Sequence, residues 1–511
     1  MNNLIKTVLG AGFAMAIAFY VQSSFGHMPH AEFLMIAAIF GAYMAMNIGA
    51  NDVANNVGPA VGSGAITIGG AILIASIFEA SGALIAGGDV VKTIKKGIID
   101  PSAFGSDPMI FVYAMAGALL AAALWLNLAT WLKAPVSTTH SIVGGVMGAG
   151  IAAGGFAIVS WGTMGKIVAS WIISPLLGGL IAAGFLYIIK SEILHKDDRL
   201  NSAKKVVPIL VSVMAMAFIT YLTIKGLKHI WSDIQAILPF LPEGKKPSIG
   251  IALVFGVIGA IVTYILIKPR INKKIESLSD DRMAINTLFT IPLIFSAGML
   301  SFAHGANDVA NAVGPLAAIY DAIAHTTIST KASIPLWVMV TGGVGISVGL
   351  ALFGPRLIKT VGSEITELDQ MRAFSIMMAA AITVVIASQL GLPVSSTHIA
   401  VGGVFGVGFL REWLDRKGTN EKHTQLNKQL EVVDKYKKEL ANVGNDYKKK
   451  VELIERVKAE KKIAKQIKKE LREKYVKRGM VKKIVLAWII TVPAAAILSA
   501  IIFFILKGMG V

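Results

Sequence analysis

The chain has 511 residues, is 54% hydrophobic and only 16% charged, and has a mean hydropathy of +0.65. A soluble protein of this length needs more polar surface to cover its core, so the composition indicates a membrane protein. The chain contains no cysteine, which excludes disulfides, thiolate metal sites and cysteine nucleophiles.

Apolar runs long enough to be candidate membrane spans follow one another along the chain, and most approach the roughly 20 residues that cross the hydrocarbon layer. We predict an all-α polytopic membrane protein with about 12–13 spans. The first run, which contains Lys6, could suggest a secretory signal peptide, but it is rather long and no small-residue cleavage site follows it, so we interpret it as the first span. The runs are 5–25, 32–48, 65–86, 109–132, 136–158, 166–190, 206–224, 248–268, 287–304, 333–354, 371–390, 394–411 and 483–507.

Two motifs each occur twice. Gly-Ala-Asn-Asp-Val-Ala-Asn stands at 49–55 and again at 305–311, an offset of 256 residues. Pro-Val-Ser-Thr-Thr-His at 135–140 returns as Pro-Val-Ser-Ser-Thr-His at 393–398, an offset of 258 residues. The chain is therefore predicted to contain two copies of one structural unit.

A weaker sequence similarity relates 166–173 to 483–490, at an offset of 317 residues. This offset exceeds the 258 residues of the second motif by 59, which indicates an insertion of 59 residues in the second copy, between about 409 and 482. Residues 411–483 hold 24 Lys and Arg against 12 Asp and Glu, so they supply most of the net charge of +18. Apolar residues recur there at helical spacing, and Asn-Val-Gly-Asn at 442–445 could divide the stretch into a helical hairpin.

The basic insertion is compatible with nucleic-acid binding, but a basic loop beside a membrane more simply marks the cytoplasmic side. We therefore expect a cytoplasmic appendage and no nucleic-acid partner; coiled-coil self-association is an alternative. The loops 190–205 and 268–282 are also basic. If 411–483 is cytoplasmic, the last span, 483–507, runs outward, whereas its counterpart 166–190 ends at the basic loop 190–205 and so runs inward. Corresponding spans of the two copies are therefore expected to run in opposite directions. This predicts two inverted-topology repeats with interrupted helices at a central site.

The predicted organisation has five parts: the first transmembrane repeat (1–190), a connecting span and loops (191–247), the second repeat (248–411), a charged helical cytoplasmic insertion (412–482) and the last span of the second repeat (483–511). We place the protein in the inner membrane of the cell, as a multi-pass protein.

Asp52 and Asp308 lie within otherwise apolar regions, where a carboxylate costs several kcal/mol unless it faces a cavity, a cation or a partner. Glycines and prolines near each aspartate are expected to interrupt its helix, among them Pro59 and Pro315. On a continuous helix, Asn51 and Asn55 would share one face beside Asp52.

The second motif is typical of a helix start, because proline suits the first turn and serine or threonine can cap free amides. Such an end offers N–H and hydroxyl donors and a positive dipole to an anion. Because no Lys or Arg lies within either motif, an anion beside the carboxylates needs a mobile cation or proton, and hard oxygen ligands suit Na⁺. A protonated phosphate oxygen could donate to a carboxylate, whereas sulfate has no proton to donate, which favours phosphate.

Glu79 and two histidines can be interpreted either as functional residues or as structural ones. Glu79 is a third intramembrane carboxylate, and a structural hydrogen bond would also explain it. His140 and His398 invite a proton-relay or metal role, but neither motif contains a second histidine, so helix packing is the simpler interpretation.

The paired GANDVAN and PVS[ST]TH motifs resemble those of the inorganic phosphate transporter (Pit) family. The resemblance implies an inverted-repeat fold, homodimers, and phosphate import coupled to Na⁺ or H⁺, with no other cofactor and no enzyme activity. It also implies a joint substrate and cation site, with Asp52 and Asp308 as the Na⁺ candidates. That set is Asn51, Asp52, Asn55, Glu79, Ser137, Thr138, Thr139, Asn307, Asp308, Asn311, Ser395, Ser396 and Thr397.

The chain departs from the family pattern in the region 371–390, which has no carboxylate where some members carry a glutamate. The sequence is compatible with three alternatives. The chain could be a permease for sulfate or another oxyanion, a proton-coupled carrier of metal–phosphate complexes, or a membrane receptor or scaffold that acts through 412–482.

Overall fold

The computed structural model describes residues 2–104, 107–132, 136–239, 241–242, 244, 246–325, 334–364, 369–444, 446–473 and 478–509. Within these ranges the regular elements are all helices, so the predicted all-α class is confirmed. The first half contains α1 (Asn3–Phe25), α2 (Ala31–Asn51), α3 (Val53–Gly62), α4 (Ile68–Ala86), α5 (Gly88–Lys96), α6 (Pro108–Trp131), α7 (Thr138–Gly154) and α8 (Trp161–Ile189). The rest contains α9 (Arg199–Gly226), α10 (Trp231–Ile237), α11 (Ile249–Ile275), α12 (Arg282–Thr287), α13 (Thr290–Asp308), α14 (Ala310–His325), α15 (Leu336–Glu364), α16 (Gln370–Gln389), α17 (Ser396–Leu414), α18 (Arg416–Asn442), α19 (Tyr447–Glu473) and α20 (Arg478–Gly508).

Eleven helical segments in the described ranges are long and apolar enough to cross a membrane, so the chain is a multi-pass membrane protein. The predicted spans 136–158 and 394–411 are not among them. Helix α7 has only 17 residues, which at about 1.5 Å per residue falls short of a hydrocarbon layer about 30 Å thick. Helix α17 carries Arg411 and Glu412 in its last turn. These two short helices have the second motif at their starts, inside the bundle.

The sequence repeat returns as a repeat in helix packing. Helix α2 packs against α15, and its counterpart α13 packs against α4. In the same way α7 packs against α20, and its counterpart α17 packs against α8. Each copy therefore packs its motif-bearing helices on helices of the other copy. The opposite orientation of the two copies in the membrane stays a prediction.

Glycines permit the closest of these helix crossings. A Cβ atom at Gly49 would lie 1.9 Å from the carbonyl oxygen of Ile346, and one at Gly305 would lie 2.2 Å from that of Glu79. Both distances are far below van der Waals contact, so only glycine fits at either position. The two glycines are related by the 256-residue offset of the first motif, so the copies share a packing device as well as a motif.

The predicted helix interruptions occur at the aspartates rather than at the neighbouring glycines and prolines. Helix α2 ends at Asn51 and α3 begins at Val53, while α13 ends at Asp308 and α14 begins at Ala310. Pro59 lies inside α3 and Pro315 inside α14. At the first break the Asn55 N–H donates to the Asp52 carbonyl at 2.9 Å, which is a local tightening of the helix.

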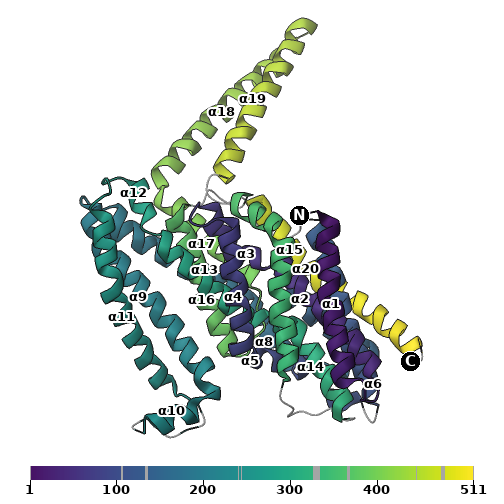
Figure 1. Ribbon diagram of the computed structural model, residues 1–511. Coiled ribbons are helices and arrows are strands. Elements are labelled where there is room, and N and C mark those ends of the chain that lie inside the picture. The colour runs from purple at the N-terminus through teal and green to yellow at the C-terminus, as the bar shows by residue number, and fades with distance from the viewer. Residues whose placement is uncertain are drawn as a thin grey trace.

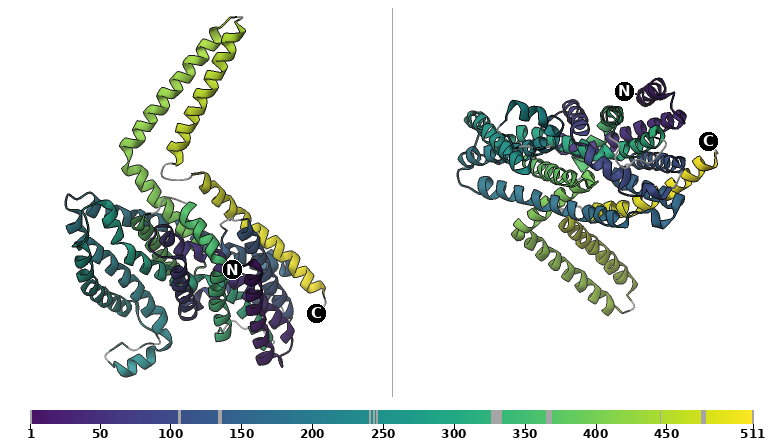
Figure 2. Two further views of the ribbon diagram at one scale, coloured as in Figure 1. Left: turned by 45° about the horizontal axis from the view of Figure 1, so that its top comes forward. Right: turned by 90° about the horizontal axis from the view of Figure 1, so that it is seen from below.

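Two parts of the chain lie beside the central bundle. Helices α9 and α11 pack on each other and form one flank (Figure 1). Helices α18 and α19 form an antiparallel hairpin that projects from one end of the bundle (Figures 1 and 2). Helix α18 ends at Asn442, inside the stretch where the sequence predicts a break.

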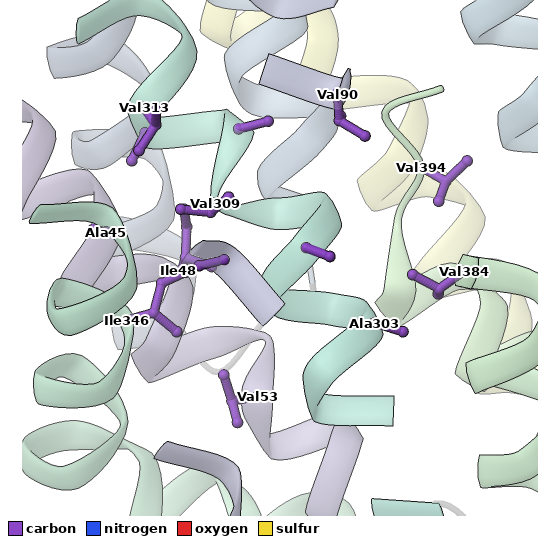
Figure 3. Packing of buried hydrophobic residues seen from close by; sticks show 14 of the residues in the cluster. Ala45, Ile48, Val53, Val90, Ala303, Val309, Val313, Ile346, Val384 and Val394 are labelled. Carbon is purple, nitrogen blue, oxygen red and sulfur yellow. The ribbon is translucent and has the colours of Figure 1, made fainter. Parts of the chain in front are cut away.

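Aliphatic side chains surround the helix breaks. Ile48, Val53, Val309 and Ile346 are fully buried members of one continuous hydrophobic core. Figure 3 shows them coming together from α2, α3, α15 and the segment between α13 and α14. Polar side chains at the breaks are therefore held in a region of low dielectric.

Candidate functional site

The two aspartates at the helix breaks meet on one hydroxyl group at the start of α7. Thr138 Oγ1 lies 2.7 Å from Asp52 Oδ2 and 3.2 Å from Asp308 Oδ2. Both aspartates are almost completely buried. Thus the first motif of each copy and the second motif of the first copy converge at a single point.

Ser137 and Ser395 cap their own helices, as the sequence predicts for this motif. The Ser137 hydroxyl accepts from the His140 N–H at 3.1 Å, and that of Ser395 accepts from the His398 N–H at 3.3 Å. Pro393 stands before the cap of α17 rather than in its first turn, which corrects the sequence-based placement. Both serine hydroxyls fix the direction of their helix starts.

Asparagines from the first motif bind threonines of the second motif in the other copy. Asn55 Nδ2 donates to Thr397 Oγ1 at 2.9 Å. Asn311 Nδ2 donates to Thr139 Oγ1 at 3.2 Å and also lies 3.1 Å from Thr138 Oγ1. Because Asn55 and Asn311, and likewise Thr397 and Thr139, are related by the repeat offsets, the site has approximate twofold symmetry.

Asn51 and Asn307 bind other partners than the threonines of the second motif, and Asn307 Oδ1 accepts from the Val394 N–H at 3.2 Å, just before α17. Asn51 Nδ2 donates to Thr130 Oγ1 at 2.8 Å, and Asn307 Nδ2 donates to Ser388 Oγ at 3.0 Å. The helix break separates Asn51 from Asn55, so the two do not share a helix face as expected. Thr130 and Ser388 were not predicted, although their separation of 258 residues equals the offset of the second motif and could have identified them.

His304 is the site residue that sequence reasoning missed. Its Nδ1 lies 2.7 Å from Glu79 Oε2, and its Nε2 lies 3.1 Å from Asp308 Oδ2. Asn56 Nδ2 donates to the other Glu79 oxygen at 2.8 Å. His304 lies one helical turn before Asp308, and this spacing in the sequence could have identified it as a neighbour of the aspartate. The counterpart position in the first copy is Ile48. The polar contacts of His304 with Glu79 and Asp308 therefore have no equivalent in the first copy, and they break the twofold symmetry.

The site concentrates negative charge. Asp52, Glu79 and Asp308 are all buried, and none of the hydrogen bonds and ion pairs described for them comes from lysine or arginine. Ligand atoms of Asp52, His304 and Asp308 lie within 4.8 Å of one another. Neighbouring buried carboxylates are costly unless a cation or proton lies between them, so the cluster suits a cation.

Several buried polar atoms at the site have no hydrogen-bond partner among the described residues. They include Asp308 Oδ1, Asn311 Oδ1 and Ser396 Oγ. A buried polar atom without a partner costs about 1–3 kcal/mol, so each favours a bound ligand. The oxygens can accept a cation, and the Ser396 hydroxyl can donate to an oxyanion beside the start of α17.

His140 and His398 face each other within a cluster of four rings. Their ring centroids are 4.5 Å apart, and each ring also lies against a tryptophan, Trp171 at 3.8 Å and Trp488 at 3.6 Å. The Trp171 indole N–H donates to the Pro393 carbonyl at 3.1 Å. This arrangement packs the starts of α7 and α17 together.

The sequence pattern of the phosphate transporter family matches residues 48–499 of this chain. A Helicobacter pylori protein provisionally named a phosphate permease is 49% identical, over 96% of this chain and 94% of its own length. A Pyrococcus abyssi protein with the same provisional name is 36% identical, over 93% of this chain and 98% of its own length. A solved structure titled "The sodium-dependent phosphate transporter" is 33% identical, has a TM-score of 0.73, and is matched over 93% of this chain and 99% of that one.

The family match, the relatives and the solved structure agree with the resemblance carried by the paired motifs, and the family is one of transporters rather than enzymes. The chain belongs to the phosphate transporter family.

Proposed function

We propose that this chain imports inorganic phosphate across the inner membrane by cotransport with Na⁺. The observation that carries the proposal is the meeting of Asp52 and Asp308 on the Thr138 hydroxyl, beside the starts of α7 and α17. A helix start attracts an oxyanion and the carboxylates attract a cation, so each ion lowers the cost of binding the other. Coupling then follows from electrostatics, because a site holding one ion alone is unbalanced.

In this proposal the roles divide between the helix starts and the helix breaks. Ser396 presents toward phosphate its hydroxyl, which has no partner among the described residues, while Asp52 and Asp308 hold Na⁺. Thr139 and Thr397 shape the site from the helix starts, and the Thr139 hydroxyl donates to the Val394 carbonyl at 2.9 Å. Asn55 and Asn311 keep the threonines in place across the two copies. Ser137 and Ser395 cap the helices and so orient their N–H groups. The symmetric packing of α2 on α15 and of α13 on α4 supports two inverted repeats around the site.

Proton coupling is the second candidate, and His304 favours it. Glu79, His304 and Asp308 form a continuous buried chain of groups that can each hold a proton. Such a chain can carry a proton toward Asp308 without a metal ion. The solved relative is titled sodium-dependent, which favours Na⁺ as the first choice here.

Radiolabelled phosphate uptake by the purified protein in proteoliposomes tests the proposal. We expect uptake with an inward Na⁺ gradient, and none when choline replaces Na⁺. Uptake driven only by a proton gradient would reassign the carboxylates as proton carriers. Competition by sulfate, or a requirement for a divalent metal without Na⁺, would favour the other two transport readings. Absence of phosphate uptake under every gradient contradicts the proposal.

Deletion of the hairpin of α18 and α19 tests whether the protein acts as a transporter or as a receptor or scaffold. We propose that it lies in the cytoplasm and is not part of the transport unit, because it projects from the bundle (Figure 2). Replacing 416–473 by a short Gly-Ser linker should leave most of the uptake. Complete loss of uptake by a correctly inserted deletion variant would assign the hairpin an essential role.

We also propose a homodimer. Helix α11 carries a large exposed apolar surface, and lipid or a second copy could cover it. Cross-linking or mass measurement in mild detergent decides between a monomer and a dimer.

A further inference from the structure

A cavity of about 710 Å³ lies between α1, α2, α6 and α15, outside the convergence of the two aspartates. Along α1 it is lined by Asn3, Lys6, Thr7, Gly10, Ala11, Ala14 and Met15. These positions recur every three or four residues, so they form one face of the helix. From Asn3 to Met15 this face extends about 18 Å, at about 1.5 Å per residue. The cavity is therefore an elongated groove along the helix axis.

The groove is cationic at one end and apolar further in. Lys6 lies in the first turns of α1, and Arg356 lies in the last third of α15. Met15, Met46 and Phe353 are among the apolar residues deeper in the groove. Among the described residues that line the groove there is no Asp or Glu. The N-terminus lies at the same end of the bundle as the α18–α19 hairpin (Figure 1).

The groove opens toward the outer surface of the bundle. Met15 is 64% exposed, Phe353 37% and Trp131 77%. In a membrane-spanning helix, an exposed apolar side chain at this depth faces lipid rather than water. An occupant can therefore enter sideways from the bilayer.

We infer that this groove is a binding site for a phospholipid with a net negative headgroup. The headgroup lies between Lys6 and Arg356, and an acyl chain lies against Met15, Met46 and Phe353. Basic pockets between membrane helices suit anionic headgroups, and Lys6 and Arg356 are the two cationic side chains among the described residues that line this one. A free phosphate ion would use the cationic end but would leave the apolar length empty.

The groove also contacts a residue that supports the candidate site. Thr130 lines it and accepts the hydrogen bond from Asn51 Nδ2 at 2.8 Å. Asn51 is the last residue of α2, directly before Asp52. A bound lipid therefore stabilises the wall that holds the first helix break.

Native mass spectrometry of the purified protein in neutral detergent tests the inference directly, without any transport assay. The probes are phosphatidylglycerol and, as the neutral comparison, phosphatidylcholine with the same acyl chains. We expect preferential retention of phosphatidylglycerol. Lys6→Gln with Arg356→Gln should lower its apparent affinity by about tenfold or more.

Two controls have matched chemistry. Lys268→Gln with Arg270→Gln removes the same charge from the exposed end of α11 and should change nothing. Ala11→Phe fills the groove without changing charge and should also weaken retention, whereas Gly12→Phe, on a neighbouring position with open space, should not. Monodisperse elution of each variant confirms folding.

Three outcomes would overturn the inference. Equal retention of both lipids removes the charge argument. Equal loss in the α11 control means that net charge, rather than the groove, governs binding. Displacement of phosphatidylglycerol by millimolar inorganic phosphate assigns the cationic end to the free ion.

Discussion

Asp52 and Asp308 are 256 residues apart in the sequence, yet both lie within hydrogen-bond distance of the hydroxyl of Thr138, at 2.7 and 3.2 Å. A single hydroxyl hydrogen cannot satisfy two carboxylates fully, and both are buried. The excess negative charge gives the site an affinity for a small cation or a proton. Each aspartate terminates one half of an interrupted helix, so the charge also lies where the two copies meet.

Replacing either aspartate by asparagine should abolish coupled uptake while the protein remains in the membrane. Asparagine keeps the size of the side chain and removes the charge that holds the cation. We expect Asp52→Asn and Asp308→Asn each to lower uptake by about a hundredfold or more, which corresponds to roughly 3 kcal/mol of lost cation binding. Asp280→Asn, at an exposed loop position, is the matched control. Near-normal uptake by both variants would remove these residues from the site.

His304 should matter for stability as well as for transport. His304→Leu removes one partner each from Glu79 and Asp308, which keep, among the described residues, only the neutral donors Asn56 and Thr138. Each buried carboxylate oxygen that loses its partner costs about 1–3 kcal/mol. We expect a lower unfolding temperature in detergent, followed by scanning fluorimetry, and uptake reduced by about tenfold or more. His304→Gln keeps an amide donor and should restore part of the stability. Ile48→Leu, at the counterpart position, should be close to neutral. A fully stable and active His304→Leu variant contradicts this assignment.

The sequence predicted those parts of the fold and site that occur twice. The motif offsets identified Asp52 with Asp308 and the serine caps of α7 and α17, because a repeated environment leaves a repeated pattern. His304 was not predicted as a site residue, because its counterpart is Ile48 and a residue that occurs in only one copy leaves no repeated pattern. The helix breaks were expected at Pro59 and its neighbours, but a proline inside a membrane bundle is tolerated when neighbouring helices satisfy the freed backbone groups. Which side chains cross between copies depends on tertiary packing, which spacing along the chain does not reveal.

The glycine crossings provide a test of the packing repeat. A methyl group at Gly49 or Gly305 would overlap a backbone carbonyl oxygen, at 1.9 and 2.2 Å. Since backbone atoms on a packed helix have little freedom to move, we expect Gly49→Ala and Gly305→Ala each to cost at least about 2 kcal/mol. Gly12→Ala, which meets nothing within 4 Å, should be neutral or slightly stabilising, because alanine is the better helix former. The measurement is the unfolding temperature by fluorescence-detected gel filtration. Wild-type values for both crossing variants would contradict the packing described here.

A buried ion pair joins α5 to α14. Lys95 Nζ lies 3.1 Å from Asp321 Oδ2, and both side chains are less than a tenth exposed. Removing one partner leaves the other charge buried, so Lys95→Met should destabilise the protein by about 3–5 kcal/mol. His325 Nδ1 lies 3.0 Å from the other oxygen of Asp321 and should reduce that loss when protonated.

The double variant Lys95→Met with Asp321→Leu distinguishes two free-energy contributions. One is the net stabilisation by the ion pair, and the other is the cost of leaving a single charge buried without its partner. Replacing both partners by apolar side chains should recover most of the stability. The exposed pair Arg456–Glu452 on α19, at 2.7 Å, is the control, because disrupting it should cost no more than about 1 kcal/mol. If the double variant is as unstable as Lys95→Met, the pair contributes net attraction rather than only mutual neutralisation. In that case the charges themselves hold α5 against α14.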